Sequence, residues 1–428
     1  MKAKKRKIRQ LVCIFVLMCL FPLSACNKTR GNSWIFGKEK GRKVVRVEDH
    51  SDALLYFLKN KFKNRVVLHI DAHDDSRFVS ENNIKEIKQL SSENKYALLK
   101  ERSGISYGSK GKVFNIGNFL YAGFKLGVVK KVYWVFPAGK LIPESLGKVR
   151  EYLRKIGFKK ESAQSFRYEN GFFRGVRNGL PIVLCTQKNI PDITETAVVS
   201  LDTDYLMGVY ANPMKMPLGD LTKKLFDDLK RNNIRTDFVL ISYSVRGMTL
   251  PLMHRYAGDY LVDLIINPKD ELNMSEGIVK ARDTALKMRY RAKYDDSIKY
   301  LQKLVEADGK NASIYYDLAL SYLAKKDMNK TTEFLKKAIK NDPIYFLGYI
   351  EIGNILISQG IFKKEERTSI VSRFLKNSFG FLKDNVKAKS YVMLGNAMFF
   401  NGAVRKAQVQ YSNALKEVVG ITKYEFRN

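Results

Sequence analysis

From residue 44 to about residue 268, the chain alternates short apolar runs with longer amphipathic stretches. Apolar runs of about four to eight residues are typical of buried strands, whereas apolar positions spaced three and four apart indicate helices. We predict strands at 44–47, 66–70, 131–136, 182–186, 198–201 and 238–242, and helices at 51–61, 118–126, 146–156 and 221–231. Strands that alternate with helices favour an α/β domain with a mainly parallel sheet.

The rest of the chain lacks strand-like runs and instead repeats a pattern of aromatic and small residues. The clearest unit contains Tyr315, Leu318, Ala319, Tyr322, Ala338 and Pro343. These spacings resemble the tetratricopeptide repeat, a helix pair with a period of about 34 residues. Steps of about 34 residues place Ala285 and Gly353 at the position of Ala319, and a last unit around Gly395 follows an insertion. The resemblance implies an all-α solenoid over 275–428 whose concave surface binds a protein or peptide partner, with a generic helical bundle as the alternative.

The first 26 residues have the pattern of a targeting segment. Six basic residues precede an apolar run over 11–23, and residues 23–26 read Leu-Ser-Ala-Cys. The pattern is typical of a secretory signal, and its last four residues resemble a bacterial lipobox, which implies cleavage before Cys26 and a lipid on that cysteine. An uncleaved transmembrane anchor is the alternative, although the apolar run is short for a bilayer span. We therefore expect a lipid-anchored, exported protein of the cell envelope, tethered to its membrane through 27–43.

The formal net charge of +33 comes mostly from lysines spread along the chain. Such a charge is typical of nucleic-acid-binding proteins, but here no basic block is interleaved with aromatic residues, and an exported protein rarely meets nucleic acid. We expect no nucleic-acid partner. Attraction to anionic lipid headgroups and simple solvation of lysine-rich faces remain as explanations of the charge. Cys13 and Cys19 lie in the signal, so Cys185 has no disulfide partner once Cys26 carries a lipid.

Two short acidic clusters each follow a predicted strand. Asp71, His73 and Asp75 follow one strand, and Asp202 and Asp204 follow another. Alternate positions on an extended backbone share one face, and parallel sheets place their sites at the carboxyl ends of strands. Burial of several carboxylates is costly without compensation. A divalent metal supplies that compensation, and this donor set suits Mn²⁺, Fe²⁺ or Zn²⁺; ordinary turn chemistry at strand ends is the alternative.

The segments 71–75 (Asp-Ala-His-Asp-Asp) and 200–204 (Ser-Leu-Asp-Thr-Asp) resemble the hallmarks of the arginase/deacetylase superfamily. The segment 49–51 (Asp-His-Ser) is similar to the upstream histidine context of its ureohydrolases. The resemblance implies a three-layer arginase-like domain over 44–270. It also implies two divalent metals, with manganese preferred over iron or zinc. One metal would be held by His50, Asp71, Asp75 and Asp202, and the second by Asp71, His73, Asp202 and Asp204.

The reaction implied by this resemblance is hydrolysis of a non-peptide C–N bond in a small molecule, by a hydroxide held between the metals. A guanidine, an amidine and an amide are the candidate substrates. The chain also departs from the family. Its four histidines are His50, His69, His73 and His254, and none forms the tandem pair that deacetylases use as a general base. The guanidine-binding acid of arginases has no clear counterpart either.

Other candidate residues are fewer and each has a plainer alternative. For catalysis we name His254 as a proton shuttle, with a surface histidine as the alternative, and Tyr243 as an oxyanion donor. For substrate binding we name Asn115, Asn118 and Arg246. Polar turn chemistry explains the two asparagines equally well, and Arg246 would favour an acidic substrate. We expect His69 to support the site or the core.

Two hypotheses follow. The first is a metal-dependent C–N hydrolase displayed on the cell envelope. The second is an envelope scaffold whose repeats bind a protein partner and whose metal domain is structural or inactive.

Overall fold

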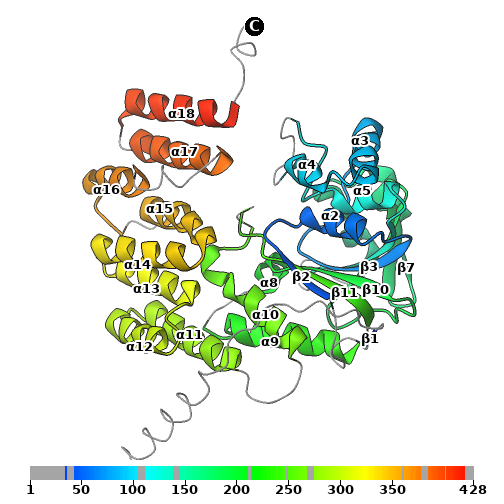
Figure 1. Cartoon of the computed structure of the whole chain (residues 1–428), viewed down its shortest axis with the longest axis horizontal. Coiled ribbons are helices and arrows are strands. Elements are labelled where there is room, and N and C mark those ends of the chain that lie inside the picture. The colour runs from blue at the N-terminus through cyan, green and yellow to red at the C-terminus, as the bar shows by residue number, and fades with distance from the viewer. Residues whose placement is uncertain are drawn as a thin grey trace, which may run out of the picture. The chain divides into compact units, whose positions relative to one another are not determined.

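The structure is a computed structural model that describes residues 34–35, 43–104, 111–137, 145–210, 214–232, 234–246, 249–267, 274–358, 361–376, 384–400 and 402–419 (Figure 1). The described residues form two compact units, one within Asn27–Val279 and the other within Lys280–Asn428. The expected signal over 1–26, with Cys26, and most of the tether over 27–43 lie outside the described residues. In the described part, no helix has the length and apolar character needed to cross a membrane.

The first unit is built around one large sheet. Its strands are β1 (Trp34–Ile35), β2 (Lys43–Val47), β3 (Arg65–Ile70), β6 (Val129–Val135), β7 (Arg167–Glu169), β8 (Phe172–Arg177), β9 (Leu180–Cys185), β10 (Ala197–Asp202) and β11 (Arg235–Ser242). They pair in the order β1-β11-β10-β3-β6-β9-β8-β7, and β2 also pairs with β11. The strands β2, β11, β10, β3, β6 and β9 run parallel. The alternating pattern therefore predicts the main sheet correctly.

The edges of the sheet differ from that prediction. Strand β1 pairs antiparallel with β11, and β7, β8 and β9 form an antiparallel meander at the other edge. Asn178 and Gly179 make the two-residue turn between β8 and β9 with φ of +51° and +88°. Both positive angles are typical of a tight hairpin turn. A separate small sheet pairs β4 (Ser103–Gly104) with β5 (Phe114–Asn115).

The order of the strands reverses between β3 and β10. After β3 the chain adds β6 and then β9 on one side, and then returns to place β10 and β11 on the other side of β3. Loops that leave neighbouring strands in opposite directions open a crevice at the carboxyl ends of those strands, which is where ligands of open α/β sheets bind. Both acidic clusters lie at the ends of these two strands.

Helices cover both faces of the sheet (Figure 1). One face packs against α2 (Asp52–Lys59), α3 (Glu81–Ser92), α4 (Tyr96–Glu101), α5 (Phe119–Lys125), α6 (Leu146–Lys155) and α7 (Lys160–Ser165). The other face packs against α8 (Asp204–Val209), α9 (Leu218–Arg231) and α10 (Tyr256–Ile266). Along β3, Val67 enters the first apolar core, whereas Val66 and Leu68 enter the second. The sheet is therefore buried on both sides, as its continuous apolar strands predict.

The second unit is all-helical in its described residues. Its helices are α11 (Met274–Tyr290, shared with the end of the first unit), α12 (Tyr294–Ala307), α13 (Ala312–Ala324), α14 (Met328–Asn341), η2 (Pro343–Leu347), α15 (Gly348–Ser358), α16 (Lys364–Lys376), α17 (Asp384–Phe400) and α18 (Val404–Val419). Consecutive helices pack against each other, as α13 does with α14 and α17 with α18. A Cβ atom on Gly395 would lie 2.5 Å from the Tyr411 ring, so a small residue is needed there.

A buried ion pair ties the segment after β3 to the β8–β9 hairpin. Asp74 accepts hydrogen bonds from the backbone N–H of Ser76 at 3.0 Å and from the guanidinium of Arg177. Arg177 also donates to the carbonyl of Gly157 at 3.1 Å and lies 4.0 Å from the centre of the Phe158 ring. Asp74 and Arg177 are both buried, so each charge depends on the other for its compensation.

Arg177→Met therefore leaves the Asp74 carboxylate buried without a cation, and we expect the α/β unit to lose about 3–5 kcal/mol of unfolding free energy. Urea unfolding followed by tryptophan fluorescence measures this unit, because both tryptophans of the chain belong to it. The double variant Asp74→Asn/Arg177→Met should recover part of the loss, since it removes the charge as well as its partner. A loss below about 1 kcal/mol in the single variant would contradict a stabilising role for the pair.

Candidate metal centre

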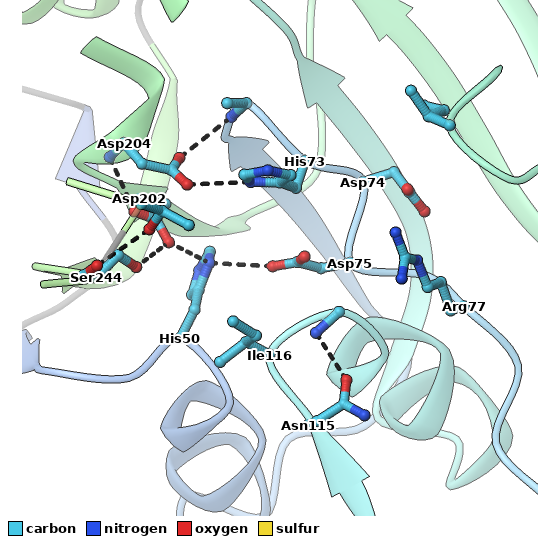
Figure 2. A pocket seen from close by; sticks show the side chains of 14 residues that line it. His50, His73, Asp74, Asp75, Arg77, Asn115, Ile116, Asp202, Asp204 and Ser244 are labelled. Atoms are coloured by element: carbon cyan, nitrogen blue, oxygen red, sulfur yellow. Dashed lines mark hydrogen bonds and ion pairs between the residues drawn. The ribbon is translucent and has the colours of Figure 1, made fainter. Parts of the chain in front are cut away.

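The candidate centre lies where four parallel strands end (Figure 2). His50 follows β2, Asp71 follows β3, Asp202 ends β10 and Ser244 follows β11. The register pairs Asp202 with Ser242 on β11 and places Ser200 beside His69 on β3. These side chains come together because neighbouring parallel strands end at one edge and alternate residues share a face.

Three carboxylate oxygens surround one nitrogen of His50. The distances to its Nδ1 atom are 2.9 Å for Asp71 Oδ2, 3.1 Å for Asp202 Oδ2 and 3.2 Å for Asp75 Oδ2. In the described structure neither His50 Nδ1 nor Asp71 Oδ2 has a hydrogen-bond partner. An octahedral ion with bonds of about 2.1 Å separates neighbouring ligand atoms by about 3.0 Å. The three distances from His50 Nδ1 to the carboxylate oxygens are close to that spacing.

Asp71 also faces a second imidazole. Its Oδ1 atom lies 3.4 Å from His73 Nδ1, and that nitrogen lies 3.0 Å from Asp204 Oδ2. The two oxygens of Asp71 thus point to different histidines, Oδ2 to His50 and Oδ1 to His73. His50, Asp71, Asp202 and Asp204 are buried, whereas the His73 side chain is 55 % exposed. Asp71 therefore occupies the middle of the centre, with a buried imidazole on one side and an exposed one on the other.

Residues behind the carboxylates hold them in place. Ser200 Oγ lies 2.8 Å from His50 Nε2, which leaves Nδ1 facing the carboxylates, and Ser244 Oγ donates to Asp202 Oδ2. Backbone N–H groups two residues ahead donate to Oδ1 of Asp71, at 2.7 Å, and to Oδ1 of Asp202, at 2.9 Å. Such partners fix the orientation of metal ligands and are as much part of a metal site as the ligands.

Two residues of the centre have unusual backbone angles. Asp75 has φ of +45° and Ser244 has φ of +50°, in the left-handed region that residues other than glycine seldom adopt. Each such conformation costs about 1–3 kcal/mol. The carbonyl of Asp75 is held by the backbone N–H of Leu120 at 3.1 Å. Both angles turn a side chain toward the carboxylate cluster, which places this strain at the site.

Crowding of charge governs the protonation of the centre. Burial, together with the charges of Asp204 and Asp202, raises the pKa of Asp71 to about 6. Burial and the charge of Asp71 raise the pKa of Asp75 to about 8. Hydrogen bonds to Asp204 and Asp71 raise the pKa of His73 to about 12. Burial alone would lower the pKa of His50, but the three carboxylates around it raise that pKa well above its usual value.

A bound cation could compensate the charge of these crowded, buried groups. Without one, the carboxylates share protons with each other and with the imidazoles; a divalent ion would hold all of them ionised and relieve the repulsion. The buried groups His50, His69, Asp71 and Asp75 could hold a metal ion. His69 is fully buried, and its Nε2 lies 3.4 Å from Asp71 Oδ2 and 3.2 Å from the carbonyl oxygen of His73. His69 therefore lies next to the carboxylate of Asp71, where it could support the site as we expect.

The centre opens into a cavity of about 300 Å³. Asn115 is among its lining residues, whereas Asn118 is not; the side chain of Asn118 instead accepts from the backbone N–H of Asn115 at 2.7 Å. Arg246 also does not line the cavity and lies 3.6 Å from Asp49. The structure thus brings one of the three proposed substrate-binding residues to the cavity.

The two proposed catalytic residues lie elsewhere in the fold. Tyr243 donates its hydroxyl to Asp259 at 2.6 Å, and its ring packs against Gly258 of α10. His254 is buried in the 3-10 turn η1 (Leu252–His254), with its ring 5.5 Å from that of Tyr210. Neither residue lines the cavity.

Several lining residues have no counterpart among the sequence-based candidates. They are Ala72, Asp74, Arg77, Ile116, Gly117, Ile156, Ser244 and Thr249. Strand alternation could have found Ser244, since it lies two residues after Ser242 at the end of β11. Arg77 comes from the loop after β3, whose path depends on tertiary packing, and Ile156 ends the helix predicted over 146–156. The sequence carries no local signal that either residue faces the cavity. The sequence matches no protein-family model and no curated protein.

The raised carboxyl pKa values predict how pH changes the stability of the metal-free protein. Asp75 ionises near 3.8 when unfolded and near 8 when folded, so the folded state binds the extra proton between these values. The unfolding free energy should therefore fall by about 1.4 kcal/mol per pH unit across this window through Asp75 alone. Thermal unfolding between pH 5.5 and 8 with a chelator, and again with Mn²⁺, measures the effect. We expect the gap between the two melting temperatures to widen as pH rises, and a constant or narrowing gap would contradict a metal site here.

Proposed function

We propose that the protein is a metal-dependent hydrolase of a non-peptide C–N bond in a small molecule. We propose further that its centre holds two divalent metals, of which manganese is the preferred one. The observation that carries the proposal is the position of Asp71, whose two carboxylate oxygens face His50 and His73, and both imidazoles line a small-molecule-sized cavity. One metal would be held by His50, Asp71, Asp75 and Asp202. The other would be held by Asp71, His73 and Asp204, with Asp202 near both.

Two metals bound in this way supply a water nucleophile at neutral pH and polarise the group under attack. The residues of the chain position both reactants. Ser200 and Ser244 orient His50 and Asp202, while Asn115 and Thr249 offer neutral polar groups along the cavity. The cavity is too small for a folded protein substrate and suits a small molecule. These features support the reaction class that the resemblance to the arginase/deacetylase superfamily implies.

The lining of the cavity favours an amide over a guanidine or an amidine, because both of these are cations at neutral pH. Apart from the proposed metal ligands, the carboxylate among the described lining residues is Asp74, and its charge is already matched by Arg177. A guanidinium group would need an ionised carboxylate as its partner. The cavity instead includes a cation, Arg77, which would repel a guanidinium group.

The rest of the chain fits display on the cell envelope. The lipobox-like segment before Cys26 supports lipid anchoring. The helix pairs α13–α14 and α17–α18, with small residues at the repeat positions Ala319 and Gly395, support tetratricopeptide repeats that bind a protein or peptide partner. A scaffold role for these helices is compatible with catalysis in the α/β unit.

Metal stoichiometry tests the two-metal proposal. Wild-type full chain loaded with Mn²⁺ should retain about two ions. Asp75→Asn, which touches the His50 end, should leave about one ion, whereas Asp71→Asn should leave fewer than about half an ion because this residue faces both imidazoles. Elemental analysis after gel filtration measures the content, and Asp192→Asn, an exposed aspartate, is the matched control. Less than about half an ion per wild-type chain, or equal losses of bound metal in the two variants, would contradict the two-metal proposal.

Hydrolysis of a panel of N-acetyl, amidine and guanidine compounds tests the activity. We expect Mn²⁺-dependent cleavage of N-acetyl compounds that disappears in Asp202→Asn. Ser200→Ala should retain the fold but lose about 10–100-fold in metal affinity or kcat/KM, because it orients His50 without binding the metal itself. Asp192→Asn should retain wild-type activity. Full metal content without hydrolysis of any panel member would favour the scaffold hypothesis.

A further inference from the structure

A second cavity of about 490 Å³ adjoins the metal-centre cavity. Its wall comes from three places in the α/β unit: the segment after β3, the end of α6 with the residues that follow it, and the β8–β9 hairpin turn. Arg77 and Ile156 line both cavities. The two cavities are therefore immediate neighbours, with Arg77 and Ile156 at their common border.

The charge of the second cavity is opposite to that of the metal ligands. Its ionisable lining residues are all cations: Arg77, Lys155, Lys159 and Arg177. Arg177 is matched by Asp74, and Lys155 by the exposed Glu151 at 2.8 Å. An exposed ion pair such as Lys155–Glu151 contributes little binding energy. Lys159 makes no ion pair within the described residues, so the cavity keeps a positive excess that an anion would match.

The floor of this cavity is rigid. The Asp74–Arg177 pair is buried, the carbonyl of Gly157 accepts from Arg177, and the Asn178-Gly179 turn fixes the end of the hairpin. Gly157 itself has φ of +96°, a conformation that favours glycine. A fixed floor with cations around it binds an anion with little loss of conformational freedom. Figure 2 shows Arg77 on the far side of the metal-centre pocket from Ser244 and Asp202, so its charge is separated from the carboxylate end.

We propose that the substrate carries an anionic group, a carboxylate or a phosphate, which binds in the cavity lined by Arg77, Lys155 and Lys159 while the scissile C–N group reaches the metal centre. This inference rests on the proposed hydrolase function and names its substrate class: a small N-acyl compound with an anionic tail. The charges at the two ends of the combined cavity then give the substrate one orientation, since an anion is repelled by the carboxylates that are not neutralised by metal and attracted by the cations beyond them.

Binding of inorganic phosphate and of acetate to the full chain tests the anion site without any need for turnover. Calorimetry is performed on chelator-treated protein, so that neither anion can bind a metal ion. We expect saturable binding of at least one anion. The anion that binds more tightly indicates whether the anionic group of the substrate is a phosphate or a carboxylate. Arg77→Gln and Lys159→Gln should each weaken this binding about tenfold, the loss typical of one charge-assisted hydrogen bond. Lys160→Gln, which changes the neighbouring exposed lysine outside the cavity, should change it less than about twofold.

A second arm separates the failure of this inference from that of the proposed function. With Mn²⁺-loaded protein, kcat/KM is measured for N-acetylglycine, N-acetylglycinamide and N-acetylethanolamine phosphate. A preference of about tenfold or more for an anionic member, reduced in Lys159→Gln at unchanged metal content, supports the inference. Hydrolysis without such a preference, or no saturable anion binding, overturns it while the hydrolase proposal stands. Anion binding without hydrolysis overturns the hydrolase proposal and keeps the cavity as an anion site.

Discussion

The mutual repulsion of carboxylates at the reversal point of the sheet is the constraint on which this site depends. Asp71, Asp75 and Asp202 each bring an oxygen to within 3.2 Å of His50 Nδ1, in a place where burial weakens solvation. Burial and this repulsion together raise the pKa values of Asp71 and Asp75, to about 6 and about 8. Protons relieve the repulsion only below these pKa values, whereas a divalent cation would relieve it with the carboxylates ionised. The strained backbone at Asp75 and Ser244 indicates that the fold maintains this arrangement at some cost in stability.

The ion pair of one aspartate, Asp74, helps to separate negative from positive charge along the two neighbouring cavities. Asp74 lies between Asp71 and Asp75 in the sequence, yet its carboxylate turns to Arg177 and Ser76 and belongs to the scaffold. The pair that it makes with Arg177 fixes the hairpin that forms part of the basic cavity. Because Asp74 and Arg177 neutralise each other, the other carboxylates lie at the candidate metal centre, and the lysines Lys155 and Lys159 lie in the second cavity. Polarity of this kind orients a substrate before any contact specific to its chemistry is made.

How far the sequence predicts this structure depends on whether the signal is local. The central strands and the helices between them follow from alternating apolar runs, and their predicted ends differ from the structure by only a few residues, as for β3 and α6. The ligand candidates His50, Asp71, His73, Asp75, Asp202 and Asp204 meet because strand alternation and parallel register place them together. The helices α3, α4 and α10 and the β7–β8 hairpin carry weaker patterns and were not predicted.

The position of Tyr243 shows where strand alternation should have been used further. Val239, Ile241 and Tyr243 share the face covered by α10, whereas Leu240 shares the opposite face with the site. Alternation therefore assigns Ser244 to the cavity and Tyr243 to the core, as the structure has them. Arg77 and Ile156 could not be found in this way, because Arg77 lies on the loop after β3 and Ile156 caps the end of α6, and only tertiary packing brings them to the cavity.

The hydrogen bonds of the aspartates also bear on turn chemistry and metal binding as alternative reasons for the two acidic clusters. Asp71 and Asp202 each use Oδ1 to accept the N–H group two residues ahead, which is what an aspartate in a turn does. Turn chemistry leaves the other oxygen free to face solvent. Here Oδ2 of both residues is instead directed inward to His50, and Asp71 Oδ2 is buried without a hydrogen bond. The turn thus aims each carboxylate at His50, in a position where a bound cation could contact the second oxygen.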